Sequence, residues 1–348
     1  MEDTLLEVRD LQVEFSTKMG IVRVLDKVNL KVDPRQTVGI IGESGCGKSM
    51  MALSIMGLVP IPPGRIAGGE ILYRGIDLLT LEKDAILDIR GKRIAMIFQE
   101  PMNSLNPVFT VGNQLVETLL RHEDMTRRDA WDKSVDMLKA VGIPSPEKRM
   151  HDYSFQMSGG MRQRVMIAMA LACSPKLIIA DEPTTALDVT IQAQILDLLR
   201  NLKDQINSSI MFITHDLGVI AEMADYVVVM YAGRIVEQGT AEEIFSHPAH
   251  PYTIGLMASK PVVGRQVDKL YSIPGKVPNP INMPNYCYFK DRCEMCVNGC
   301  EGDYPCEVSI SPTHKVSCYR YYDGKRPDLE EVVKEELAEG KENGKEGE

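Results

Sequence analysis

The sequence has no long apolar run and no leader-like N-terminus. No stretch of about eighteen consecutive apolar residues occurs, so no transmembrane helix is expected. The first residues, Met1-Glu2-Asp3-Thr4, are acidic and show none of the basic and apolar regions of a signal peptide. We therefore expect the chain to stay in the cytosol.

Basic residues are outnumbered, and no internal repeat is visible. Lys and Arg number 39 against 49 Asp and Glu, which gives a net charge of −10. Residues 323–348 hold ten acids and five bases, and therefore half of that excess. The rest of the chain is only mildly acidic and has no basic stripe, which argues against nucleic acid as the main partner. Because residues 323–348 contain few apolar side chains, we expect this tail to be disordered.

The residues that are present describe an ordinary soluble protein with an α/β pattern. Apolar residues make up 44% and charged residues 25% of the chain, and the length suggests about two domains. Short strand-like runs alternate with helix-like segments, which indicates an α/β core. Strands are expected at 22–25, 28–32, 177–180 and 210–213, a hairpin at 227–237, and helices at 112–141 and 191–202.

The most informative stretch is Gly42-Glu43-Ser44-Gly45-Cys46-Gly47-Lys48-Ser49. It follows an apolar run and precedes a helix-like segment, so G-x-x-x-x-G-K-[ST] stands in the strand–loop–helix setting that a P-loop requires. Glycine-rich turns are common in α/β proteins, but the complete pattern in this setting favours a phosphate-binding loop.

Each part of this loop has a chemical task. Glycines let successive backbone N–H groups point at one anion, and the following helix adds the positive end of its dipole. Lys48 can then reach the β- and γ-phosphates, and the Ser49 hydroxyl can ligate Mg²⁺. The chain is therefore expected to bind a nucleoside triphosphate together with Mg²⁺.

A pair of acids follows the apolar run at 177–180. Two carboxylates at the end of a buried strand are costly, because nothing in an apolar core compensates their charge. Asp181-Glu182 has the arrangement of a Walker B motif, in which Asp181 positions Mg²⁺ through water and Glu182 orients or deprotonates the attacking water.

A further motif, built around the pair Gly159-Gly160, connects the P-loop and the acid pair to a known family. The segment Ser158-Gly159-Gly160-Met161-Arg162-Gln163-Arg164 resembles the signature motif of ABC ATPases, although Met157 and Met161 replace its usual outer Leu and Gln. Further landmarks appear in family order: Gln99 resembles the Q-loop glutamine, Ala186-Leu187-Asp188 the D-loop, and His215 the switch histidine.

The resemblance implies a fold and a mechanism. The fold would be a P-loop domain with a RecA-like core, an antiparallel β subdomain and a helical subdomain. Two such domains would enclose two ATP molecules, each site combining the P-loop of one chain with Ser158, Gly159 and Gly160 of the other. Gln99 and His215 would join Glu182 in catalysis, and Gln99 would also join Ser49 and Asp181 around Mg²⁺.

The family also places an aromatic residue against the adenine, upstream of the P-loop. Phe15 is the aromatic nearest to that position, and it can equally be a core strand residue. ATP rather than GTP therefore follows from the resemblance alone.

A narrower resemblance is to the peptide-permease branch of the family. It is carried by Ser246-His247-Pro248-Ala249-His250-Pro251-Tyr252-Thr253, by Ile273-Pro274-Gly275 and by Glu100-Pro101-Met102-Asn103-Ser104-Leu105-Asn106-Pro107. The branch implies two transmembrane permease subunits as partners at the cytoplasmic face of the cell membrane. It also implies a second, paralogous ABC ATPase subunit and, indirectly, an extracellular substrate-binding protein.

The cysteines are clustered, with six of eight between Cys287 and Cys318. In a cytosolic chain such clustering favours a metal site over a disulfide framework. The positions resembling Cys287, Cys293, Cys300 and Cys318 hold a [4Fe–4S] cluster in some members of the branch, so the resemblance implies a cluster here. Zinc and free or partly disulfide-linked thiols stay open, because four thiolates suit zinc equally well and Cys296 and Cys306 exceed the pattern. The isolated Cys46 and Cys173 are interpreted as small apolar residues.

These observations divide the chain into three parts. Residues 1–258 are expected to form the nucleotide-binding domain, with its helical subdomain at about 105–165. Residues 259–322, in which prolines and cysteines gather, are expected to form a small irregular C-terminal domain. The acidic tail occupies 323–348.

The leading functional hypothesis is the ATPase subunit of an ABC importer for di- or oligopeptides, driven by ATP-dependent dimerisation. The alternative is a soluble iron–sulfur ABC ATPase acting on ribosomes or nucleic acid. That alternative would need two nucleotide domains and an N-terminal cluster, whereas this sequence has one P-loop and C-terminal cysteines. A regulatory module with a degenerate ATPase conflicts with the intact Lys48, Asp181, Glu182 and His215.

Overall fold

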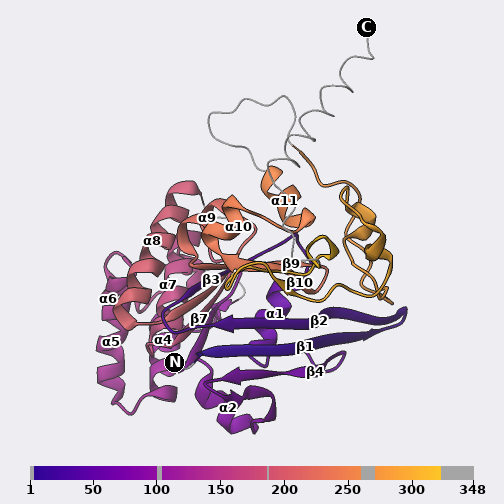
Figure 1. Cartoon of the computed structure of the whole chain (residues 1–348). Helices are drawn as coiled ribbons and strands as arrows, with labels where there is room; N and C mark the ends of the chain where they lie inside the picture. Colours follow the sequence, from indigo (N-terminus) through magenta and orange to yellow (C-terminus); the bar gives the residue numbers. More distant parts are fainter. Residues whose placement is uncertain (1–3, 100–103, 186–187, 260–270, 323–348) are drawn as a thin grey trace.

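The computed structural model describes residues 4–99, 104–185, 188–259 and 271–322, which are arranged around two β-sheets (Figure 1). The larger sheet has the strand order β11-β12-β10-β9-β3-β8-β7-β6. Its strands are β3 (Thr37–Ile41), β6 (Ile94–Ile97), β7 (Leu177–Asp181), β8 (Ser209–Ile213), β9 (Tyr226–Tyr231), β10 (Arg234–Thr240), β11 (Val308–Ser309) and β12 (Lys315–Val316).

The centre of the larger sheet is parallel and fully buried. Neighbouring strands from β6 to β9 pair in parallel, and every residue of β3, β7 and β8 is buried. Continuous apolar runs are expected where helices cover both faces of a sheet. The strands expected at 177–180 and 210–213 are thereby confirmed, as is the hairpin, in which β9 and β10 pair across Ala232 and Gly233.

The smaller sheet is antiparallel, in the order β2-β1-β4-β5. It comprises β1 (Leu6–Thr17), β2 (Gly20–Val32), β4 (Gly64–Tyr73) and β5 (Ile76–Asp77). The expectation of separate strands at 22–25 and 28–32 was wrong, because β2 is continuous. Leu11 pairs with Val28 and Val13 with Leu25, so β2 uses one residue more than β1 between these pairs. A bulge at Lys27, which has a φ of 50°, absorbs the extra residue without ending the strand.

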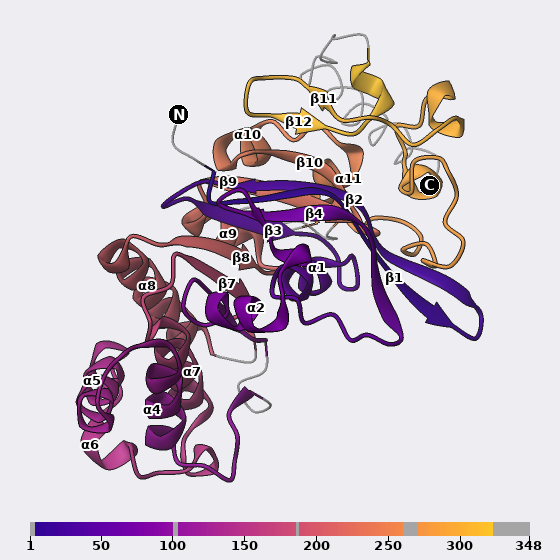
Figure 2. The ribbon, with the colours of Figure 1, turned by 90° about the horizontal axis from the view of Figure 1, so that it is seen from below.

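Helices form a separate layer at one end of the molecule (Figure 2). The expected single helix over 112–141 is two helices, α4 (Val111–His122) and α5 (Arg127–Ala140). The break arises because Glu123 is extended and Thr126 caps α5, its hydroxyl accepting from the Asp129 N–H at 3.2 Å. The short α6 (Pro146–Arg149) and the longer α7 (Gly159–Leu171) complete this layer.

The remaining helices connect the strands. They are α1 (Lys48–Ile55), α2 (Lys83–Ile89), α8 (Val189–Ile206), α9 (Leu217–Met223), α10 (Ala241–Ser246) and α11 (Pro251–Ala258), with short 3₁₀ turns at Leu78–Thr80, Ser154–Gln156, Lys290–Arg292, Asn298–Glu301 and Tyr319–Tyr321. Among the described residues, no helix combines the length and the apolar character needed to cross a bilayer.

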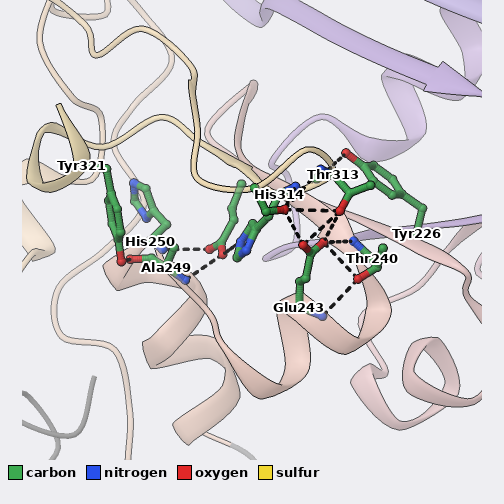
Figure 3. A network of polar contacts seen from close by, with 10 residues as sticks. Tyr226, Thr240, Glu243, Ala249, His250, Thr313, His314 and Tyr321 are labelled. Carbon is green, nitrogen blue, oxygen red and sulfur yellow. Dashed lines mark hydrogen bonds and ion pairs between the residues drawn. The ribbon is translucent and has the colours of Figure 1, made fainter. Parts of the chain in front are cut away.

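The C-terminal segment is fastened to the edge of the larger sheet. Strand β12 pairs with β10, and the Ser317 N–H donates to the Val236 carbonyl at 2.8 Å. Nearby, the buried Glu237 carboxylate accepts from the N–H groups of Ala249 and His250 at 2.7 and 2.8 Å and lies 2.7 Å from His314 Nε2 (Figure 3). This network ties β10, the start of α11 and the C-terminal segment into one unit.

Candidate nucleotide site

The glycine-rich loop follows β3 and leads directly into α1, as the sequence predicts. Gly42, Gly45 and Gly47 have φ values of 151°, 78° and 103°, which favour glycine. A Cβ on Gly42 would lie 2.2 Å from the Met230 carbonyl oxygen, and one on Gly47 would lie 2.8 Å from Leu25 Cδ2. The loop therefore tolerates no side chain at these two positions.

Lys48 is buried at the start of α1 and points back under the loop. Its Nζ donates to the carbonyl oxygens of Gly42 at 2.8 Å and Glu43 at 3.0 Å. A cavity of about 220 Å³ opens beside it. The cavity is lined by Val24, Ser44, Gly45, Gly47, Lys48, Ser49, Met50, Gln99 and Glu182. The fold thus brings the predicted P-loop, Gln99 and Glu182 to one place.

Asp181 ends strand β7, is buried and directly precedes Glu182 in the sequence. Burial raises the pKa of its carboxyl, and the neighbouring Glu182 charge acts in the same direction, whereas a hydrogen bond with Ser49 opposes them. Within the described part of the chain, its Oδ1 atom has no hydrogen-bond partner. A buried carboxylate oxygen without a partner, beside a serine hydroxyl, fits the donor set of a hard divalent cation.

Glu182 is the point where three predicted segments meet. Gln99 Nε2 donates to its Oε2 at 2.9 Å, Thr185 Oγ1 donates to the same atom at 2.8 Å, and His215 Nδ1 lies 3.2 Å from its Oε1. Burial alone would raise the pKa of Glu182, but the contacts with Thr185 and His215 outweigh it and lower the pKa. The carboxylate is therefore ionised at neutral pH.

The structure adds contacts that the sequence analysis missed. Thr185 stands three residues after Glu182, a spacing that could have suggested the contact. Gln163, inside the signature-like segment, donates from Nε2 to the Pro183 carbonyl at 2.5 Å and so links α7 to the turn after β7. The Tyr252 hydroxyl accepts from the Glu43 N–H at 2.8 Å, for which no local signal exists.

The signature-like residues lie at the N-terminus of α7. The Ser158 hydroxyl caps the helix by accepting from the Met161 N–H at 3.3 Å, and both Ser158 and Gly159 are exposed. Gly160 is half-buried, and Met157 is in the core. None of these residues lines the P-loop cavity of their own chain, and of the four only Ser158 and Gly159 are exposed to solvent.

Parts of two other predicted segments fall outside the described residues. These are Ala186 and Leu187 of the D-loop-like segment and residues 100–103 after Gln99. Asp188, the residue after Leu187, caps α8, and its side chain accepts a hydrogen bond from the Ile191 N–H at 2.9 Å.

Two lesser predictions concern aromatic and isolated cysteine residues. Phe15 is half-buried in β1, where it pairs with Gly64 and packs against the core, and it does not line the cavity. Its interpretation as a strand residue is therefore confirmed, and base recognition stays unassigned. Cys46 and Cys173 are both buried, as small apolar residues would be.

The four cysteines singled out by the resemblance line one small cavity. Cys287, Cys293, Cys300 and Cys318 share it with His250 and Met295, whereas Cys296 and Cys306 are exposed. Burial raises the pKa of Cys287, Cys293 and Cys318 to about 11. Among the residues that the structure describes, no three His, Cys, Asp or Glu side chains are grouped closely enough to hold a metal ion.

Two family models match the chain. Residues 25–185 match the model described as ABC transporter, and residues 236–300 match the model described as the C-terminal region of oligopeptide/dipeptide transporters.

The chain is also similar to proteins along nearly its whole length. A probable peptide ABC transporter ATP-binding protein of Sinorhizobium fredii is 50% identical over 320 residues, which cover 91% of this chain and 95% of the relative. The oligopeptide transport ATP-binding protein OppD of Bacillus subtilis is 48% identical over 338 residues, covering 97% and 93%.

Solved structures of ATP-binding cassettes share the fold. A dimeric post-hydrolysis state of the cassette MJ0796 bound to ADP and Pi has a TM-score of 0.62 at 26% identity, covering 68% of this chain and 98% of that one. The structure of cbiO1 from Clostridium perfringens, part of the ABC transporter complex cbiONQ, has a TM-score of 0.60 at 26% identity, covering 71% and 92%.

Proposed function

The chain belongs to the ATP-binding subunits of oligopeptide and dipeptide ABC importers and is an ATPase, and we propose that its hydrolytic centre is the cavity around Lys48 and Glu182. The observation that carries the proposal is the convergence on Glu182. Gln99, Thr185 and His215 come from three different segments and hold one carboxylate beside the P-loop. Residues 42–49 would bind the triphosphate, with Lys48 neutralising its charge.

Mg²⁺ would be held by Ser49 and Gln99 directly and by Asp181 through water. The buried Oδ1 of Asp181, which lacks a partner within the described residues, supports this donor set. When bound, the ion supplies charge neutralisation at the phosphates. The other steps fall to the chain's own residues. The ionised Glu182 would accept a hydrogen bond from the attacking water, and Gln99 and His215 would hold the Glu182 carboxylate in the orientation that this requires.

Hydrolysis would require a second ATPase subunit. Ser158 and Gly159 are exposed at the start of α7, where they are free to contact the nucleotide bound to a partner, and Gly160 follows them in the helix. The dimeric state of MJ0796, whose fold this chain shares, supports such an arrangement. We further propose a paralogous subunit as the partner, as the resemblance to the peptide-permease branch implies. Because the site closes only on dimerisation, a lone chain would turn over slowly.

The helical layer would receive two transmembrane permease subunits at the cytoplasmic face of the cell membrane. Val108, Phe109 and Phe155 are 74%, 50% and 63% exposed, and a bridge between Thr110 and Tyr153 brings their segments side by side. Exposed apolar side chains gathered in one place are typical of protein contacts. An extracellular substrate-binding protein would act only through the permease.

We also propose that residues 259–322 form a cysteine-rich domain that holds a [4Fe–4S] cluster, appended to the nucleotide-binding domain at 1–258. In support, Cys287, Cys293, Cys300 and Cys318 line the same cavity although they span 32 positions of sequence. Four thiolates suit tetrahedral zinc equally well, so the metal content of the purified protein decides between the two groups. The cluster would staple a segment with little hydrophobic core.

The test of this function is peptide uptake by the assembled transporter. Cells that co-express the chain with its permease subunits should take up a labelled peptide, and K48M should abolish both uptake and membrane-bound ATPase activity. K139M is the matched control, because Lys139 forms surface ion pairs with Asp136 and Glu147. Co-sedimentation with ribosomes rather than membranes would instead favour the soluble ABC ATPase alternative.

A further inference from the structure

Glu43, in the first half of the P-loop, is fixed from three sides. Its N–H donates to the Tyr252 hydroxyl at 2.8 Å, and its carbonyl accepts from Lys48 Nζ at 3.0 Å. Its carboxylate accepts two hydrogen bonds from Arg292, which lies 249 residues further along the chain. The P-loop pattern leaves this position free, so the phosphate-binding motif alone does not require the acid at position 43.

Arg292 binds Glu43 through both arms of its guanidinium. Nη1 donates to Oε2 at 2.7 Å and Nη2 donates to Oε1 at 3.0 Å. A third nitrogen, Nε, donates to the Pro274 carbonyl at 2.8 Å, and the guanidinium lies near the ring of Tyr231. The Arg292 side chain is 5% exposed and the Glu43 side chain 28%. Such a forked, partly buried pair is geometrically specific, unlike a surface ion pair.

Aromatic side chains fill the space around this pair. Tyr231 packs against Tyr252 and Phe289 with ring centroids 4.7 and 5.2 Å apart, and Tyr252 packs against Phe289 at 5.5 Å. Tyr231 comes from β9, Tyr252 from α11 and Phe289 from the C-terminal segment. Tyr252, whose hydroxyl accepts from the Glu43 N–H, thus packs directly against Phe289 of the C-terminal segment.

The negative charge of Glu43 would oppose the binding of a triphosphate, and the positive charge of Arg292 compensates it. Glu43 immediately precedes Ser44, which lines the cavity assigned to the triphosphate. An uncompensated carboxylate one residue away would repel a polyanion, and the repulsion would be strong where solvent screening is reduced. Arg292 cancels this charge and fixes the loop at the same time.

We propose that Arg292 is a positioning residue of the nucleotide site, so that the C-terminal segment completes the P-loop and sets its affinity for ATP. This inference rests on the proposed assignment of residues 42–49 to the triphosphate. Arg292 also connects the P-loop to the cysteine-lined cavity. It ends the 3₁₀ turn Lys290–Arg292, which stands between Cys287 and Cys293 in the sequence. The Lys290 N–H donates to the Cys287 carbonyl and the Cys293 N–H to the Lys290 carbonyl, each at 3.1 Å. The turn that carries Arg292 is thereby held between two of the cysteines that line the cavity.

The test is a double-mutant cycle on nucleotide affinity. The dissociation constant of a non-hydrolysable ATP analogue with Mg²⁺ is measured by titration calorimetry for the full-length wild type, R292M, E43Q and E43Q/R292M. R292M should weaken binding about tenfold, which corresponds to about 1.4 kcal/mol. In the E43Q background the same change should weaken binding less than twofold, since no carboxylate is left unpaired.

Two further variants keep the result interpretable. K315M removes a cation from the same C-terminal segment, where Lys315 pairs with Glu307, and should leave affinity unchanged. R292K retains the charge but loses the fork, and should weaken binding to an intermediate degree even where R292M does not fold. A wild-type affinity for R292M, or an equal loss in both backgrounds, would overturn the proposal. Failure of the wild type itself to bind the analogue would instead count against the assignment of the P-loop.

Discussion

Gln99 and Glu182 are joined directly, with Gln99 Nε2 lying 2.9 Å from Glu182 Oε2 although 83 residues separate them. Gln99 follows β6 and Glu182 follows β7, which are adjacent parallel strands. The carboxyl ends of such strands meet at one edge of the sheet, and β8, the next strand, delivers His215 to the same edge. The strand order thus brings together the residues of the proposed hydrolytic site.

Ser158 should act on the nucleotide of the partner subunit and not on that of its own chain. In the assembled transporter, S158R should lower ATP turnover about 10²-fold, the cost of losing one transition-state donor. Labelling of this chain by a photoreactive ATP analogue should be unchanged, because its own P-loop stays intact.

The matched control for that experiment is S145R, which places the same charge at another exposed serine of the helical layer. It should leave turnover unchanged. If S158R abolished the labelling of its own chain, the assignment of Ser158 to a partner's site would be wrong.

The cysteine cavity should contain iron and sulfide. Protein purified without oxygen should hold about four iron and four sulfide atoms per chain and absorb visible light. C300S, which removes a buried thiol of the cavity, should lose the metal, whereas C296S, at an exposed position, should keep it. Zinc alone would make the site a plain structural staple, and the absence of any metal would refute the cluster.

Glu243 should make the attachment of the C-terminal segment to α10, here called the C-terminal anchor, sensitive to acid. The anchor consists of the hydrogen bonds that Ser311 and Thr313 donate to the Glu243 carboxylate. Burial opposes ionisation, but hydrogen bonds from Ser311, Thr240 and Thr313 lower the pKa of Glu243 from 4.5 to about 2 (Figure 3). A carboxyl with a depressed pKa in the folded state contributes stability that is present above pH 4.5 and lost as the pH falls towards 2. E243Q should therefore reduce the free energy of unfolding by about 1 kcal/mol at pH 7.

The difference between wild type and E243Q should shrink as the pH is lowered from 4.5 towards 2, which urea unfolding at a series of pH values would measure. E242Q, at the exposed neighbouring position, is the control and should follow the wild type. A constant difference across this range would show that the Glu243 charge does not stabilise the anchor.

Much of the site could be predicted from the sequence because its signals are local. The apolar run at 177–180 implies a buried strand by itself, and Asp181 and Glu182 must then lie at the strand's end. Gly42 and Gly47 of the P-loop likewise mark positions where a side chain would collide, since a Cβ on Gly42 would lie 2.2 Å from the Met230 carbonyl oxygen.

What the sequence could not predict depends on contacts between distant residues. Strand β12 has two residues, too few for a periodic signal, and forms only because β10 offers its edge. The pairs Glu237–His314 and Glu43–Arg292 join positions 77 and 249 residues apart, and neither member carries a local sign of its partner. The bulge at Lys27 could not be predicted from the local sequence either, because it is defined by the register of β1 against β2.

The most direct test of the account is the hydrolysis rate of E182Q in the assembled transporter, measured together with ATP binding. If Glu182 activates the attacking water, turnover should fall on the order of 10³-fold while ATP binding persists and the ATPase subunits stay closed as a dimer. E222Q is the matched control, because Glu222 pairs with Arg200 on the surface. Turnover undiminished in E182Q would contradict the mechanism.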